Sequence, residues 1–172
     1  MATPDDINEL LAKLDEERGA FLAGVGDLSE EAAELRRPDL DGEAGWSAKE
    51  QFSHLAEMEL SYLVTAQRAV TGADIEQQRP RYPLARAHTA TVAQHLEELA
   101  RLREQTVNYI HYLTPEEFDA RVISGAFPEM SVLQWLRSYY RHDRMHLAQI
   151  EGRQSDYQPR FVGGEPDQRR RG

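Results

Sequence analysis

Two histidines, His142 and His146, stand four residues apart in a segment with helical periodicity. Residues at this spacing lie one turn apart on the same face of a helix, so both imidazoles can reach one metal ion. The arrangement is a known metal-binding pattern on helices. Both side chains are expected at the edge of the apolar face of their helix. The pair therefore predicts a metal site if a third ligand comes from elsewhere in the chain.

His54 is the candidate for that third ligand, because it holds a similar position on a second predicted helix. If the two helices are neighbours, three imidazoles converge inside one end of the protein. The alternative is three partly buried histidines that hydrogen bond to carboxylates. Glu59 and Asp143 fall on apolar faces, where an unpaired charge is costly, so they are the acids for that role. Periodicity alone leaves both alternatives open.

Four long segments carry apolar residues at helical spacing: about residues 4–25, 47–71, 87–112 and 131–152. Ser47 with Glu50, and Ser131 with Gln134, match capping boxes at the starts of the second and fourth segments. Each segment has one apolar face, which is typical of an all-α four-helix bundle.

The sequence between and after these segments indicates connections rather than further long helices. Residues 29–35 are expected to form a short helical turn, and residues 121–124 are too few to predict a strand. Gly24 and Gly26 are expected to end the first helix. We predict one domain over residues 1–152 and a flexible C-terminal tail over residues 153–172, which is rich in Gly, Pro, Gln and Arg.

Composition excludes several classes of function. The 172 residues are 40% hydrophobic and 29% charged, and no apolar run is long enough to cross a membrane. The net charge of -10 disfavours binding to nucleic acid. The acidic N-terminus lacks the features of a signal peptide, so a cytoplasmic location is expected. The chain has no cysteine, so any thiol chemistry must use a thiol from a substrate or cosubstrate.

Two further groups of residues are candidates for binding a substrate. Arg79, Arg81 and Arg86 cluster in a polar connection, which is either a solvated loop or a rim that binds an anion. Tyr62 and Tyr139 lie on apolar faces, where they either pack in the core or line a pocket.

Two motifs resemble the signatures of the DinB/YfiT-like four-helix-bundle proteins. The first is WSAKEQFSHL at residues 46–55; the second is SVLQWL at residues 131–136, followed by HDRMHLAQI at residues 142–150. The resemblance implies an up-down-down-up bundle with a divalent metal on His54, His142 and His146. Imidazole ligands suit zinc, nickel, iron and copper, with zinc or nickel expected first.

The resemblance also implies an activity, because related proteins include transferases and isomerases that use bacillithiol, mycothiol or glutathione. We expect a metal-dependent thiol S-transferase that adds a low-molecular-weight thiol to a small electrophile, acting as a homodimer. Asp143 and Glu59 are the candidates for catalytic residues or for support of the metal ligands. The alternatives are a metal-assisted hydrolase and a non-catalytic metal-binding stress or interaction protein.

Overall fold

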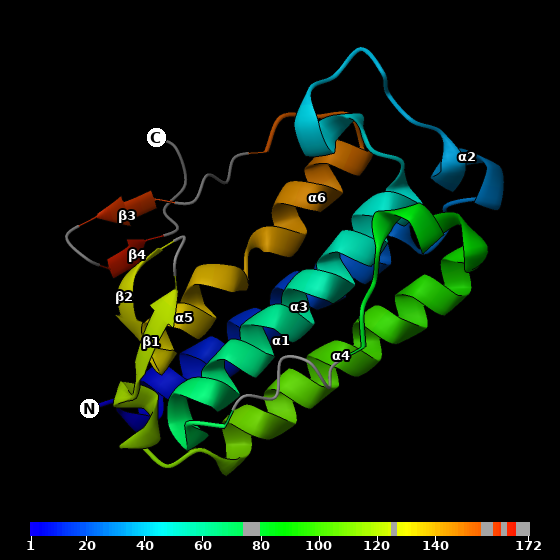
Figure 1. The fold of residues 1–172 in the computed structure, drawn as a ribbon. Coiled ribbons are helices and arrows are strands. Elements are labelled where there is room, and N and C mark those ends of the chain that lie inside the picture. The colour runs from blue at the N-terminus through cyan, green and yellow to red at the C-terminus, as the bar shows by residue number, and fades with distance from the viewer. Residues whose placement is uncertain (74–79, 125–126, 156–159, 163–164, 168–172) are drawn as a thin grey trace.

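The computed structural model describes residues 1–73, 80–124, 127–155, 160–162 and 165–167. Its long helices are α1 (Pro4–Val25), α3 (Ala48–Thr71), α4 (Val92–Tyr112) and a fourth in two pieces, α5 (Val132–Tyr139) and α6 (His142–Ile150). The first and last run in one direction and the middle two in the other (Figure 1). This arrangement confirms the predicted up-down-down-up bundle. None of the described helices combines the length and apolar character needed to cross a membrane.

Capping boxes explain where the long helices begin. Ser47 with Glu50 and Ser131 with Gln134 form the two boxes that the sequence predicts. Thr91 and Gln94 form a third, which starts α4 at Val92 rather than at the predicted residue 87. Residues 84–89 form the separate 3-10 helix η3 (Leu84–Thr89) instead.

Shorter elements lie between the long helices and after the last one. They are α2 (Glu30–Glu34), the 3-10 helices η1 (Gly42–Gly45) and η4 (Glu117–Asp119), and the strands β1 (Arg121–Ser124), β2 (Phe127–Ser131), β3 (Arg160–Val162) and β4 (Glu165–Asp167). β1 pairs antiparallel with β2, a hairpin that the sequence did not predict, in which Val122 and Met130 are partners and are both buried. β3 pairs with β4 within the part of residues 153–172 that is described; flexibility of this tail stays a prediction.

The two pieces of the fourth helix correct the prediction of one continuous helix over residues 131–152. Tyr140 and Arg141 separate α5 from α6. α1 ends at Val25 with Gly26 as its C-cap, as the sequence predicts, and a Cβ atom at Gly24 would lie 2.7 Å from Cδ1 of Leu147. The glycine therefore permits α1 and α6 to pack closely.

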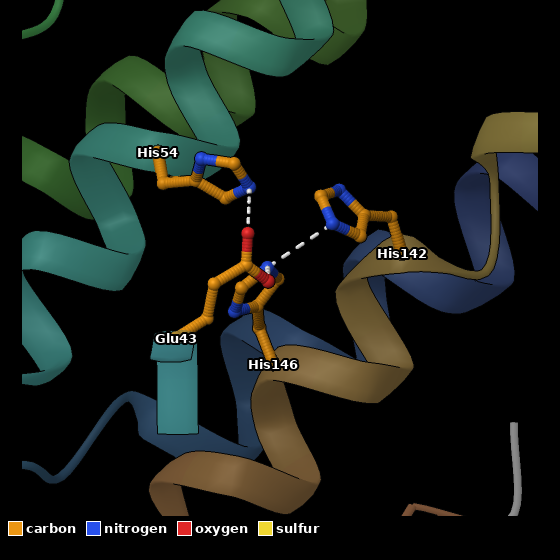
Figure 2. A group of neighbouring side chains, drawn as sticks. All are labelled: Glu43, His54, His142 and His146. Carbon is orange, nitrogen blue, oxygen red and sulfur yellow. Dashed lines mark hydrogen bonds and ion pairs between the residues drawn. The ribbon is translucent and has the colours of Figure 1, made fainter. Parts of the chain in front are cut away.

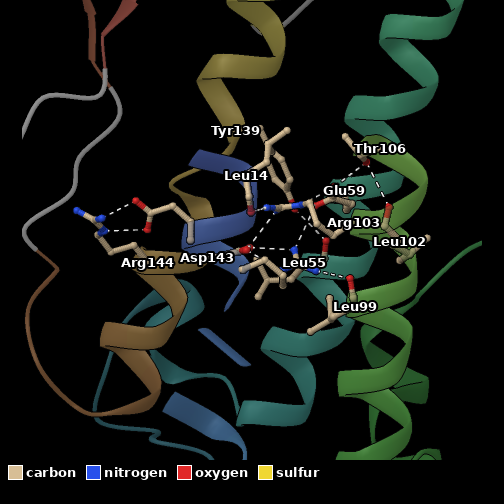
Figure 3. A network of polar contacts seen from close by, with 12 residues as sticks. Leu14, Leu55, Glu59, Leu99, Leu102, Arg103, Thr106, Tyr139, Asp143 and Arg144 are labelled. Atoms are coloured by element: carbon tan, nitrogen blue, oxygen red, sulfur yellow. Dashed lines mark hydrogen bonds and ion pairs between the residues drawn. The ribbon is translucent and has the colours of Figure 1, made fainter. Parts of the chain in front are cut away.

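The centre of the bundle holds two arginines and two carboxylates, one from each long helix (Figure 3). Arg18 of α1 donates to both oxygens of Asp143 on α6, at 2.7 and 3.0 Å, and to Glu59 of α3 at 3.1 Å. Arg103 of α4 donates to Glu59 at 2.9 Å and to Asp143 at 3.2 Å. No side chain of the four is more than 6% exposed.

Hydrogen bonds to neighbouring groups complete this buried ion network. Arg18 donates to the carbonyl of Leu99 at 2.6 Å, and the hydroxyl of Thr106 donates to Glu59 at 2.7 Å. Burial alone would raise the pKa of Glu59 and of Asp143, but the two guanidinium groups outweigh it and hold both pKa values below the ordinary range. The four groups are therefore charged and balance one another.

Removing one charge from this network should destabilise the protein strongly. In Glu59→Gln, two buried guanidinium groups would share a single carboxylate, and we expect a loss of about 3–5 kcal/mol in the free energy of unfolding. Urea denaturation measures the loss. Glu104→Gln, which alters an exposed carboxylate on α4, is the matched control and should change stability little. Equal stability of the two variants would contradict the network's role.

Candidate metal centre

Three imidazoles meet between α3 and α6 (Figure 2). The ring centroid of His54 lies 5.3 Å from that of His142 and 5.1 Å from that of His146. The Nε2 atoms of His142 and His146 are 3.1 Å apart. Two nitrogens that bind one zinc ion at its usual distance are separated by roughly 3–3.5 Å. The spacing of the predicted pair therefore suits a shared metal ion.

Glu43 brings a carboxylate to the same point. It lies on η1, and its Oε1 is 3.4 Å from Nε2 of His54 while its Oε2 is 3.8 Å from Nε2 of His146. One ligand atom from each of these four residues lies within 4.8 Å of the others. Three nitrogens and an oxygen at this spacing form a donor set that could hold a divalent metal.

The contacts of His146 and His54 indicate which of their ring nitrogens could bind a metal. Nδ1 of His146 lies 3.0 Å from Oε1 of Gln51, an acceptor that requires the proton on Nδ1 and leaves Nε2 of the neutral ring with a lone pair. Nε2 of His54 is buried and has no hydrogen bond, since its 3.4 Å contact with Glu43 lacks suitable geometry. A buried nitrogen without a partner, directed at other ligand atoms, fits a metal position.

Burial keeps the three rings neutral. Desolvation is the main cause that lowers the pKa of His142 to about 4, and the neighbouring His54 lowers it further. Desolvation also lowers the pKa of His54, and it lowers the pKa of His146 well below its ordinary value. Neutral imidazole is the form that binds metals. The site is therefore prepared for a cation.

Aromatic side chains surround the rings. Trp46 packs edge-on against His54 with centroids 5.3 Å apart, and the ring of Tyr139 lies 5.4 Å from that of His142. Tyr62 stacks on Tyr139 at 4.5 Å. Both tyrosines are largely buried, and Tyr139 donates to the carbonyl of Leu55 at 3.0 Å. The structure thus places Tyr139 beside the site and Tyr62 behind it; binding of substrate by either stays a prediction.

The other predicted site residues are not part of the cluster that Glu43 forms with the three histidines. Glu59 and Asp143 belong to the buried ion network. Their contacts match the internal ion pairs that were one of the two alternatives open from the sequence. Arg81 pairs with Glu57 of α3 at 3.3 Å, and Arg86 is exposed on η3. Arg79 lies outside the described residues.

Sequence reasoning missed Glu43 and the role of Gln51. Glu43 sits in an irregular connection, where no periodic spacing relates a side chain to the histidines. Gln51 was within reach, because it precedes His54 by three residues on the same face of α3.

Arg37 and Gly45 hold the connection that carries Glu43. The backbone N–H of Arg37 donates to the carbonyl of Gly45 at 3.1 Å and closes the loop. The guanidinium of Arg37 donates to the carbonyls of Gln149 and Ile150, at 2.9 and 2.8 Å, at the C-terminal end of α6. The loop is therefore anchored to the helix that provides two of the histidines.

A four-helix bundle that gathers three histidines and a carboxylate between two helices defines a candidate metal-binding bundle protein. Residues 13–150 match the sequence pattern of the DinB superfamily. The match covers most of the chain, so the protein belongs to the DinB superfamily, as the two motifs predicted.

Among solved structures, the fold is similar to that of YfiT from Bacillus subtilis, with a TM-score of 0.69 and 17% sequence identity. The similarity covers 88% of this chain and 87% of that chain. YfiT is described as a probable metal-dependent hydrolase with an unusual four-helix bundle topology. At this identity the likeness establishes the fold alone. No curated protein matches the sequence significantly.

The loop geometry predicts that any side chain at residue 45 in place of Gly45 lowers the stability of the protein. A Cβ atom there would lie 2.5 Å from the carbonyl oxygen of Leu40 and 3.1 Å from that of Arg37, so the backbone would have to move. We expect Gly45→Ala to lower the free energy of unfolding by about 1–3 kcal/mol in denaturant titrations. Gly19→Ala is the control: nothing lies near its Cβ position in α1, and helix propensity predicts a gain of about 0.5–1 kcal/mol. A neutral Gly45→Ala would refute the close packing of this loop.

Proposed function

We propose that His54, His142 and His146 bind a divalent metal through their Nε2 atoms, with zinc or nickel first and iron or copper as further options. The convergence of three neutral imidazoles supports the proposal, and so does the unpartnered Nε2 of His54. Three protein nitrogens leave one or more positions for another ligand, which is the pattern of catalytic rather than structural metal sites.

The activity that the geometry supports best is metal-dependent hydrolysis of a small molecule. A metal in this site would lower the pKa of a coordinated water to about 7, or deprotonate a coordinated thiol outright. A coordinated water depends more than a coordinated thiol on a base that accepts its proton. Glu43 supplies such a base beside the imidazoles. Its side chain is 35% exposed, so the carboxylate can exchange its proton with solvent. Glu43 carries this assignment.

The thiol S-transferase that the sequence predicts is the second candidate. Membership of the DinB superfamily favours it, because the resembling proteins include enzymes that use bacillithiol, mycothiol or glutathione. The chain has no cysteine, so a thiol nucleophile would come from a cosubstrate and would use the same open position. Glu43 would then receive the thiol proton. Dimerisation and a cytoplasmic location stay predictions.

Metal content tests the proposed ligands. We expect the purified protein to hold about one divalent ion per chain by mass spectrometry of digested samples, and His142→Ala/His146→Ala to lose it, because the single remaining imidazole binds weakly. His88→Ala/His111→Ala removes two exposed histidines and should keep the ion. Circular dichroism verifies that both variants are helical. Full metal retention in the first variant would exclude the proposed ligand set.

Glu43→Gln separates binding of the metal from catalysis. We expect the variant to keep its metal while hydrolysis of ester and amide substrates falls by about 10²–10⁴-fold, since a positioned base contributes that factor. Unchanged turnover in the metal-loaded variant would remove Glu43 from the mechanism.

The same panel distinguishes the activities. Turnover without added thiol supports the hydrolase, whereas loss of monochlorobimane only when thiol is present supports the transferase. A loaded protein that turns over none of the panel would favour the non-catalytic alternative.

A further inference from the structure

A cavity of about 260 Å³ lies between α3, β1 and α5. The residues that bear on its chemistry are Met58, Ser61, Thr65 and Arg68 of α3, Ile123 of β1 and Trp135 of α5. The set combines two hydroxyls and a guanidinium with apolar and aromatic side chains. This mixture is typical of pockets that bind small polar molecules. Nothing in the proposed metal centre uses this cavity.

The cavity and the metal centre share one face of α3. His54, Met58, Ser61, Thr65 and Arg68 follow one another at intervals of three or four residues, so their side chains form one stripe along the helix. The helical rise places the Cα of Met58 about 6 Å from that of His54, and the Cα of Arg68 about 21 Å away. The cavity therefore lies on the same face of α3 as His54, farther along the helix.

Arg68 is the cation of the cavity. It is exposed, and within the described part of the chain no carboxylate pairs with its guanidinium. Two other exposed arginines have acidic partners: Arg81 pairs with Glu57, and Arg101 with Glu98 at 2.6 Å. A guanidinium that no described carboxylate contacts, in a cavity that also offers hydroxyls, can bind both oxygens of an anion.

We propose that this cavity binds the carboxylate of a small organic acid. Arg68 would bind the carboxylate, with Ser61 and Thr65 as further hydrogen-bond donors, while Met58, Ile123 and Trp135 contact the carbon chain. A monoanion fits better than a phosphate dianion, because a single cation serves the cavity in a chain of net charge -10. This anion site does not rest on the proposed function.

Experiment can distinguish anion binding by Arg68 from a simpler role in helix stability. It lies in the last turn of α3, where a cation interacts favourably with the helix dipole. That role predicts an effect on stability and none on ligand binding. Arg68→Gln and Arg68→Lys therefore need a binding measurement, with circular dichroism to verify that both variants fold.

The test is isothermal titration of the purified protein, with and without its metal, using hexanoate and phenylacetate as probes and their amides as uncharged counterparts. We expect both carboxylates to bind and both amides to bind at least tenfold more weakly. Arg68→Gln should weaken carboxylate binding by about tenfold or more, the loss typical of a hydrogen-bonded charge, and Arg68→Lys should restore part of it. Arg101→Gln removes an equal charge from α4 and should have no effect.

Several results would overturn the assignment. One is that neither carboxylate shows saturable binding. Another is that the wild-type and Arg68→Gln proteins bind the carboxylates with equal affinity. A third is that Arg86→Gln weakens carboxylate binding while Arg68→Gln does not. Hexyl phosphate that binds tighter than hexanoate would overturn the choice of a monoanion. The metal-free protein is titrated too, because the anion site should bind carboxylates whether or not the metal is present. Loss of the metal therefore leaves carboxylate binding unchanged, whereas loss of the anion site abolishes it.

Discussion

The structure depends on a balanced set of four charges buried at the centre of the bundle. Arg18, Glu59, Arg103 and Asp143 come one from each long helix, and each cation contacts both anions. Buried charges are tolerated only when they are paired and hydrogen bonded, so no helix can rotate or slide without leaving an uncompensated charge. The apolar faces supply the driving force for packing, while the ions restrict the bundle to one arrangement.

That restriction reaches the candidate metal centre through α6. Asp143 faces Arg18 and Arg103, and His142 and His146 face α3 from the same two turns. The position of the carboxylate among its arginines therefore sets the rotation of the two imidazoles. The break at residues 140–141 separates α6, which carries these three side chains, from α5. Gln51 and Arg37 then fix the ring tautomer and the loop that carries Glu43.

Features set by local sequence were predictable, and features set by tertiary contacts were not. Periodicity and the capping boxes at Ser47 and Ser131 located the helices, and the two motifs identified the three histidines. The arginine partners of Glu59 and Asp143 could not be named, because the pairing joins residues up to 125 positions apart. Glu43 was missed for the same reason: only the folded loop brings it to the histidines. The hairpin of β1 and β2 depends on burial of Val122 and Met130, which a four-residue strand does not signal.

The most direct test of the metal centre is a crystal structure of the protein as purified, with anomalous scattering recorded at the absorption edge of the metal that elemental analysis finds. We expect one anomalous peak, bonded to the Nε2 atoms of His54, His142 and His146 and adjacent to the carboxylate of Glu43. A fully occupied peak elsewhere in the protein, with these three imidazoles hydrogen bonded only to one another and to protein groups, would contradict it.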